Sequence, residues 1–222
     1  MKALGKIEAV TFDVGGTLIQ PWPSVGHVYA AVAAEHGLEG LPVETLNVNF
    51  TAAWRGRKNF DHSAAAWKEL VDQTFAGLAQ VPPSRTFFRE IYDRFASGAA
   101  WRVFDDVVLA LSALRDRGLK LAVISNWDER LGPLLRQLRL DRFFQAIVVS
   151  HEVGYLKPSP AIFLEAAAQL ELATEKILHV GDQEQEDIQG AQAAGMQALL
   201  IRRGGPSVPG RQIASLSELE RI

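Results

Sequence analysis

Length, composition and charge exclude several classes of protein. The chain has 222 residues, a net charge of −3, 48% hydrophobic residues and no cysteine. It is long enough for one sizeable core, or for a core with a modest second lobe. The charge gives no electrostatic basis for binding nucleic acid or an anionic membrane, and without cysteine there is no disulfide or thiolate metal site. No apolar run approaches a membrane span, so we expect a cytoplasmic protein. We also expect a monomer or a homodimer.

The first predicted element is a buried strand over residues 7–13. An apolar run of this length that ends at turn residues is typical of a strand in a parallel sheet. Its last residue, Asp13, is followed by Val14 and then by the pair Gly15 and Gly16. Because open α/β sheets bind ligands at the carboxyl ends of their strands, Asp13 is predicted to lie in a binding site.

Residues 20–97 are predicted to form a separate helical unit. Apolar residues at helical spacing predict helices over 25–36, 43–54, 64–78 and 85–95. Ser63 is a typical N-cap and Gly37 a typical C-cap, and no convincing buried strand lies in this stretch. We therefore expect a helical cap inserted into a core made of residues 1–19 and 98–222.

The second half of the chain alternates between strands and helices. Strands are predicted over 119–124, 146–149, 177–180 and 197–201. The predicted helices cover 106–117, 128–138, 159–170 and 186–194, with a short closing helix over 216–222. Alternation of this kind implies right-handed βαβ units. The expected fold class is therefore α/β, a Rossmann-like, doubly wound parallel sheet with an inserted all-helical cap.

Polar residues follow the predicted strands where such a fold binds ligands. They are Asp13, Ser125, Lys157 and Asp182. A carboxylate such as Asp13 can attack phosphorus and form an acyl phosphate. Asp13 and Asp182 supply the carboxylate pair that Mg²⁺ needs, and Lys157 adds a compact cation for the phosphoryl group. The Ser125 hydroxyl and backbone N–H groups after Asp13 are expected to orient the remaining oxygens.

Taken singly, these residues have plainer interpretations. An aspartate at a strand end often caps a turn, and a lone lysine is usually a solvated surface residue. Ser125 and Asn126 could cap the helix that follows them, and Asp187 could serve a helix dipole. His179 is predicted to be structural. The five tryptophans are more often core residues, although Trp127 is expected to border the site.

The order and spacing of the motifs resemble the haloacid dehalogenase superfamily. The matching segments are FDVGGTL at 12–18, VISN at 123–126, GYLKPSPAIF at 154–163 and VGDQEQED at 180–187. The resemblance covers essentially the whole chain, and SNWDERL together with the cap helix that bears Trp67 is similar to one branch of the superfamily. It implies a cap of the first class and Mg²⁺-dependent hydrolysis of a small phosphorylated compound through an aspartyl-phosphate intermediate.

The resemblance also implies a role for each site residue. Asp13 is the expected nucleophile, and Lys157 is the second catalytic residue. The expected Mg²⁺ ligands are Asp13, Asp182 and the backbone carbonyl of Gly15. Asp187 is expected to support the site by orienting Lys157 or a metal-bound water. Phosphate binding is expected from Gly16, Thr17, Ser125, Asn126 and Lys157.

Gly15 departs from the phosphatases of that superfamily, which carry a second aspartate here as general acid and base. Positioned acid–base catalysis contributes on the order of a hundred- to ten-thousand-fold. Acyl and aryl phosphates have good leaving groups and need the acid least. Other proton donors would have to come from His27, His62, Arg55 or Arg57, which no motif supports. The competing interpretation is a homologue that binds phosphate and metal with little or no turnover.

Three further activities fit parts of the pattern. Dehalogenases of the superfamily also lack the second aspartate, but they need no metal and lack the Gly181–Asp182 pair. Phosphonate hydrolases have a small residue at the same place, but neither Lys58 nor Lys68 has the context of their cap lysine. Residues 13–17 are similar to the first phosphate loop of sugar kinases, whose second loop and adenosine site are missing from the sequence. All three rank below phosphatase-like hydrolysis.

Overall fold

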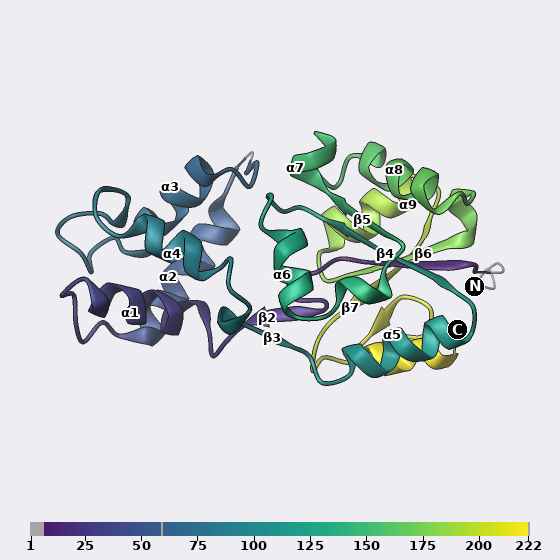
Figure 1. Ribbon diagram of the computed structural model, residues 1–222, viewed down its shortest axis with the longest axis horizontal. Helices are drawn as coiled ribbons and strands as arrows, with labels where there is room; N and C mark the ends of the chain where they lie inside the picture. Colours follow the sequence, from purple (N-terminus) through teal and green to yellow (C-terminus); the bar gives the residue numbers. More distant parts are fainter. Residues whose placement is uncertain (1–6, 59, 222) are drawn as a thin grey trace. The chain divides into compact units, whose positions relative to one another are not determined.

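The computed structural model describes residues 7–58 and 60–221 and divides the chain into two compact units (Figure 1). Met1–Gln20 and Val103–Ile222 form the core unit, and Pro21–Arg102 form the cap unit. The borders expected at 19/20 and 97/98 therefore move to 20/21 and 102/103. The second border moves further because the Trp101 indole donates a hydrogen bond of 3.1 Å to the carbonyl of Phe95. This bond holds the end of the insertion to the cap.

A six-stranded sheet forms the centre of the core unit. Its order is β5-β4-β1-β6-β7-β8, and each neighbouring pair is parallel. The strands are β1 (Ala9–Phe12), β4 (Lys120–Ser125), β5 (Ala146–Val149), β6 (Ile177–Gly181), β7 (Gln197–Ile201) and β8 (Gln212–Ile213). The α/β fold with a doubly wound parallel sheet is thus confirmed.

Strand β1 lies between β4 and β6, and all four of its residues are buried. Its last residue, Phe12, pairs with Val123 of β4 and with Val180 of β6. The N–H group of Asp13 continues this ladder with a bond of 2.9 Å to the carbonyl of Val180. The strand order therefore brings the chain after β1, β4 and β6 to one edge of the sheet.

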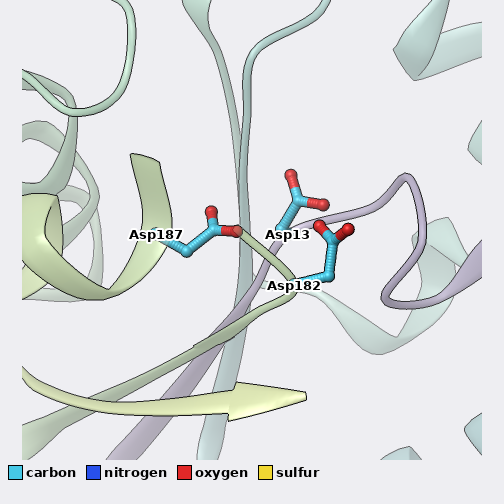
Figure 2. A group of neighbouring side chains, drawn as sticks. All are labelled: Asp13, Asp182 and Asp187. Atoms are coloured by element: carbon cyan, nitrogen blue, oxygen red, sulfur yellow. The ribbon is translucent and has the colours of Figure 1, made fainter. Parts of the chain in front are cut away.

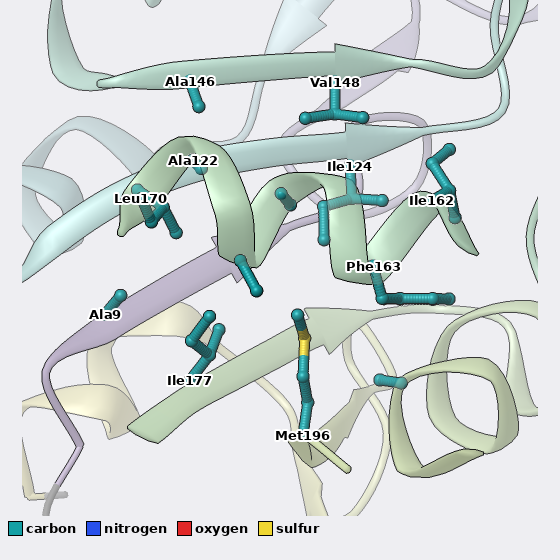
Figure 3. Close-up of a cluster of buried hydrophobic side chains, with 13 residues drawn as sticks. Ala9, Ala122, Ile124, Ala146, Val148, Ile162, Phe163, Leu170, Ile177 and Met196 are labelled. Atoms are coloured by element: carbon teal, nitrogen blue, oxygen red, sulfur yellow. The ribbon is translucent and has the colours of Figure 1, made fainter. Parts of the chain in front are cut away.

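Helices pack on the sheet and bury its apolar side chains. The regular helices of the core unit are α5 (Val107–Asp116), α6 (Leu131–Gln137), α7 (Ser150–Val153), α8 (Pro160–Leu170) and α9 (Gly190–Ala193). Figure 3 shows α8 lying over the strands, with Ile162, Phe163 and Leu170 among the buried cluster that includes Ile124 and Ile177. Burial of each large side chain contributes about 1.5–3 kcal/mol.

Some short elements of the core unit differ from the predicted ones. The predicted helix over 186–194 begins earlier, as a π-helix η5 (Glu184–Gln189), and continues into α9. The short elements α7 and β8 are not apparent from periodicity, because α7 spans four residues and β8 only two. Three 3-10 turns complete the unit, η3 (Asp141–Phe143), η4 (Thr174–Lys176) and η6 (Leu216–Arg221). The last residue of the predicted closing helix, Ile222, lies outside the described residues.

Among its described residues, the cap unit is built mainly from four α-helices, with a short 3-10 turn before the last of them. These are α1 (Val25–Glu35), α2 (Val43–Gly56), α3 (Ala64–Thr74), η1 (Pro83–Arg85) and α4 (Phe88–Arg94). Ser24 and Ser63 accept hydrogen bonds from the first turns of α1 and α3. Tyr29 stacks on Phe75 at 5.7 Å between ring centroids inside the cap core.

Two short strands were not predicted. They are β2 (Ile19–Pro21) and β3 (Trp101–Val103), which form a two-stranded sheet, with the 3-10 turn η2 (Gly98–Ala100) before β3. Strands of three residues are too short to show a period-two pattern. Within the described part of the chain, every helix is too short or too polar to cross a membrane.

Candidate active site

Three of the predicted residues meet at the end of β1. The Asp13 carboxylate is 7% exposed, and its Oδ1 atom accepts a hydrogen bond of 3.1 Å from the Ser125 hydroxyl at the end of β4. The Lys157 ammonium lies 2.7 Å from the same oxygen, and Lys157 as a residue is 4% exposed. A buried carboxylate is therefore held by one hydroxyl and one cation, and its role as nucleophile stays a prediction.

Asp187 supports Lys157 from the other side. Its Oδ1 atom lies 2.5 Å from the Lys157 ammonium, and its Oδ2 atom accepts a bond of 2.9 Å from the N–H group of Gln183. Both carboxylate oxygens of Asp187 are thus engaged by donors of the protein. This arrangement agrees with the expected role of orienting Lys157.

The backbone of Lys157 is fixed by a reciprocal pair of hydrogen bonds. Its N–H group donates to Asn126 Oδ1 at 2.7 Å, and its carbonyl accepts from Asn126 Nδ2 at 3.0 Å. The same amide nitrogen also donates to Glu186 Oε2 at 3.2 Å. The structure therefore assigns the Asn126 side chain to positioning Lys157, and its contact with phosphate stays a prediction.

Three carboxylates gather where a cation could bind. Oxygens of Asp13, Asp182 and Asp187 lie within 4.8 Å of one another (Figure 2). Asp182 directly follows β6, and its Oδ2 atom accepts a bond of 2.6 Å from Gln183 Nε2. Together with Lys157, the cluster contains more carboxylates than cations.

This excess of negative charge appears in the pKa values. Burial, aided by the charges of Asp13 and Asp187, raises the pKa of Asp182 to about 7. Burial also raises the pKa of Asp13, although Lys157 opposes it. Burial acts in the same direction on Asp187, but Lys157 and His179 together outweigh it and lower the pKa of Asp187. Burial disfavours the charged form of Lys157, yet the two carboxylates beside it raise its pKa.

The loop after Asp13 corrects one expectation. The N–H group of Gly16 donates to the carbonyl of Ile19 at 2.8 Å, and that of Thr17 donates to Val14 at 3.3 Å. These two N–H groups are thus used within the loop rather than left for a phosphate. The Thr17 hydroxyl is buried without a hydrogen-bond partner among the described residues.

Glycine is required at position 16 for two reasons. Its φ of +77° lies in the left-handed region, which side chains rarely adopt. A Cβ atom at Gly16 would also lie 2.7 Å from Asp182 Oδ2. The loop after β1 therefore approaches Asp182 closely only because it carries no side chain there.

A buried polar pair beneath the site was not predicted. His179 of β6 pairs in register with Thr11 of β1, and its Nδ1 atom lies 2.9 Å from the Thr11 hydroxyl. The other ring nitrogen lies 3.3 Å from Asp187 Oδ1. Burial lowers the pKa of His179, although Asp187 opposes this shift. The sequence signal that could have revealed this pair is the presence of Thr11 and His179 in predicted buried strands, because buried polar side chains need hydrogen-bond partners.

Trp127 borders the site, as expected. A Cβ atom built on Gly15 would lie 3.3 Å from Cζ3 of the Trp127 ring. The indole therefore lies on the side of the backbone where residue 15 would carry its side chain.

The alternative proton donors His27, His62, Arg55 and Arg57 all belong to the cap unit, and three of them have partners within it. His27 Nδ1 lies 2.8 Å from the Ser24 hydroxyl, and the Arg57 guanidinium lies 3.6 Å from the centre of the Trp54 ring. His62 is buried and contacts that same tryptophan at 6.2 Å between centroids. Each of these three residues thus has a structural role within the cap.

Comparisons with known proteins agree with this geometry. A family model described as haloacid dehalogenase-like hydrolase matches residues 7–195. Haloacid dehalogenase-like hydrolase domain-containing protein 3 of Mus musculus is 36% identical over 236 residues, covering 96% of this chain and 92% of that protein. The phosphoglycolate phosphatase of Salmonella typhi is 30% identical over 218 residues, covering 92% and 84%.

A solved structure has the same fold. The HAD-hydrolase YfnB from Bacillus subtilis bound to magnesium aligns with a TM-score of 0.78 over 98% of both chains, at 21% identity. The mouse relative represents the branch that SNWDERL and the Trp67 helix indicate. With the family model matching most of its length and these relatives aligned over nearly all of it, the chain belongs to the haloacid dehalogenase-like hydrolase family.

Proposed function

We propose that this protein hydrolyses a small phosphorylated compound with the help of Mg²⁺ and with Asp13 as the nucleophile. The observation that carries the proposal is the buried Asp13 carboxylate, which Lys157 holds at 2.7 Å while Asp182 lies in the same carboxylate cluster. The phosphatase name of the Salmonella typhi relative supports the same class of reaction.

Asp13 acts in two steps. An oxygen of its carboxylate bonds to phosphorus, the bond from phosphorus to the leaving group breaks, and the bonding pair departs with the leaving group. A water oxygen then attacks phosphorus, the bond to Asp13 breaks, and its electron pair returns to the carboxylate. One proton of the water stays on the departing phosphate and the other passes to solvent. Lys157 and Ser125 hold the carboxylate through Oδ1 in the ground state.

The donor set suits Mg²⁺. Carboxylate oxygens are the ligands that this ion prefers, and Asp13 and Asp182 bring theirs within 4.8 Å of each other. We expect these two side chains and the carbonyl of Gly15 to hold it, while Asp187 remains with Lys157 and Gln183. When bound, the ion supplies positive charge that offsets the carboxylates and the phosphoryl group.

The leaving group decides which substrates suit the site. Position 15 carries no side chain that could donate a proton. For alkyl phosphates, a positioned proton donor raises the rate of hydrolysis on the order of a hundred- to ten-thousand-fold. We therefore propose a substrate with a good leaving group, such as an acyl or aryl phosphate.

Phosphate release from a panel of alkyl, aryl and acyl phosphates tests the proposal. The assay compares the wild type with Asp13→Asn, with and without Mg²⁺. Asp116→Asn is the matched control, because Asp116 is exposed at the end of α5 in the same unit. We expect turnover in the wild type and the control, loss of turnover in Asp13→Asn, and dependence on Mg²⁺.

A second candidate function is binding of a phosphorylated ligand and metal with little or no turnover. The single observation that favours it is the missing acid–base side chain at Gly15. It is supported if every phosphate in the panel binds but none is hydrolysed. Halide release from a 2-haloacid without metal would instead indicate a dehalogenase and would contradict both candidates.

A further inference from the structure

We propose that Trp127 determines specificity by presenting its indole ring to the leaving group and selecting aryl phosphates. This inference rests on the proposed phosphoryl hydrolysis and names its substrate class. The geometric basis is the contact of 3.3 Å between Trp127 Cζ3 and the position where Gly15 would carry its Cβ atom.

This distance places the indole beside Gly15. Gly15 lies two residues after Asp13, in the loop that follows β1. Trp127 lies two residues after Ser125, whose hydroxyl donates to the Asp13 carboxylate. An aromatic ring thus occupies the direction in which residue 15 would otherwise carry a polar side chain.

The backbone of Trp127 is fixed from two sides. Its N–H group donates to the Ser150 hydroxyl at 3.1 Å, and its carbonyl accepts from the same hydroxyl at 3.1 Å. Ser150 is buried, so water competes little with these bonds. On the other side, Asn126 is bound to the Lys157 backbone. The backbone that carries the ring is therefore tied to two neighbouring segments of the core unit, which limits where the ring can lie.

The nearest acid in the sequence does not replace the missing proton donor. Asp128 is buried, and its Oδ1 and Oδ2 atoms accept bonds of 2.8 and 2.6 Å from Arg130. Both of its carboxylate oxygens are therefore engaged as acceptors in a two-pronged ion pair with Arg130. The side of the site that Trp127 borders is accordingly aromatic, and the neighbouring Asp128 is ion-paired with Arg130.

An aryl phosphate suits both features of this side of the site, namely the missing proton donor at position 15 and the aromatic ring of Trp127. When Asp13 bonds to phosphorus and the bond to the aryl oxygen breaks, the pair stays on that oxygen as a phenolate, which needs no proton. The planar ring of the leaving group can stack on an indole, and aromatic pairs of this kind are worth roughly two- to tenfold in binding. An acyl phosphate meets only the first condition.

Binding of two phosphonates separates stacking from chemistry. Phenylphosphonate and methylphosphonate carry the same anion and are not hydrolysed, so their dissociation constants can be measured by calorimetry in the presence of Mg²⁺. We expect Trp127→Leu to weaken phenylphosphonate by roughly two- to tenfold and to leave methylphosphonate unchanged. Trp127→Phe should keep most of the difference between the two. Trp22→Leu, which changes a tryptophan of the cap unit, is the matched control.

Turnover provides the second measurement. In Trp127→Leu, kcat/KM for phenyl phosphate should fall by a similar factor, while kcat/KM for acetyl phosphate should not. If Trp127→Leu does not fold, Trp127→Met offers an unbranched apolar side chain that adapts to irregular space.

The outcomes distinguish this inference from the function on which it rests. Equal effects of Trp127→Leu on both phosphonates, or no effect on either, overturn the role of Trp127 while turnover of phosphates still supports the hydrolase. Failure of the wild type to bind either phosphonate or to hydrolyse any phosphate overturns the proposed function and this inference together.

Discussion

Gly181 and Asp187 lie so close that no side chain fits between them. A Cβ atom on Gly181 would lie 2.2 Å from Asp187 Cγ and 2.3 Å from its Oδ2 atom. The end of β6 therefore must be glycine if Asp187 is to reach Lys157. Gly181 therefore contributes to the site by leaving room for the Asp187 side chain.

The first prediction is that Gly181→Ala displaces Asp187 and disables the site. Overpacking of this kind costs about 1–3 kcal/mol of unfolding free energy, and the loss of the Asp187–Lys157 pair should abolish turnover. Urea unfolding and phosphate release measure the two effects. Gly132→Ala is the control, because its Cβ atom would lie 3.7 Å from the nearest atom, Arg136 Nη1. A stable and active Gly181→Ala protein would contradict this prediction.

The second prediction concerns the buried cation. Lys157→Met should lower the free energy of unfolding by about 3–5 kcal/mol, because it leaves Asp13 and Asp187 as buried charges without their partner. Turnover should be lost as well. Lys176→Met removes an exposed ion pair of 3.0 Å with Glu8 and should cost only about 0–1 kcal/mol. Equal losses in the two variants, measured by urea unfolding at neutral pH, would rule out the special role of the buried pair.

The third prediction is a pH dependence of stability that arises at Asp106. Burial would raise the pKa of this carboxyl, but bonds from Ser215, from Arg203 and from the N–H group of Leu216 outweigh burial and lower it. A pKa below that of the unfolded chain, about 3.9, means stability that is present above this pH and is lost as the pH falls further.

Asp106→Ala measures that contribution. It should destabilise the protein by about 1–3 kcal/mol at pH 7, since it leaves buried donors without their acceptor. The difference from the wild type should shrink as the pH falls below about 4. Asp116→Ala, at an exposed position, serves as the control. A difference that stays constant between pH 7 and pH 3 would show that the carboxylate charge contributes nothing.

The fourth prediction concerns the missing acid. Gly15→Asp alone should improve hydrolysis of alkyl phosphates little, because its Cβ atom would press on the Trp127 ring at 3.3 Å. Combined with Trp127→Leu, the new carboxyl gains room to donate a proton. The double variant should raise kcat on an alkyl phosphate at least about tenfold, toward the range of positioned acid–base catalysis. Steady-state phosphate release compares both variants with Trp127→Leu alone, and an equal rate in all three would contradict the expectation.

The sequence alone determined the fold class and the residues at the sheet edge. Parallel strands present their carboxyl ends at one edge, so the order of strands and polar residues was enough to predict that Asp13, Ser125 and Lys157 meet. The contact between Ser125 and Asp13, which joins residues far apart in the chain, follows from this topology. The absence of a side chain at Gly15 was equally visible.

Tertiary structure alone decided how individual groups are used. It engaged the N–H groups of Gly16 and Thr17 inside their own loop, and it placed His179 against Asp187. It also brought Trp127 against Gly15. These contacts depend on the direction of single side chains and on loop hydrogen bonds, which have no sequence period. The pattern of residues therefore predicts which elements converge, whereas packing at the ångström scale sets what each side chain can do there.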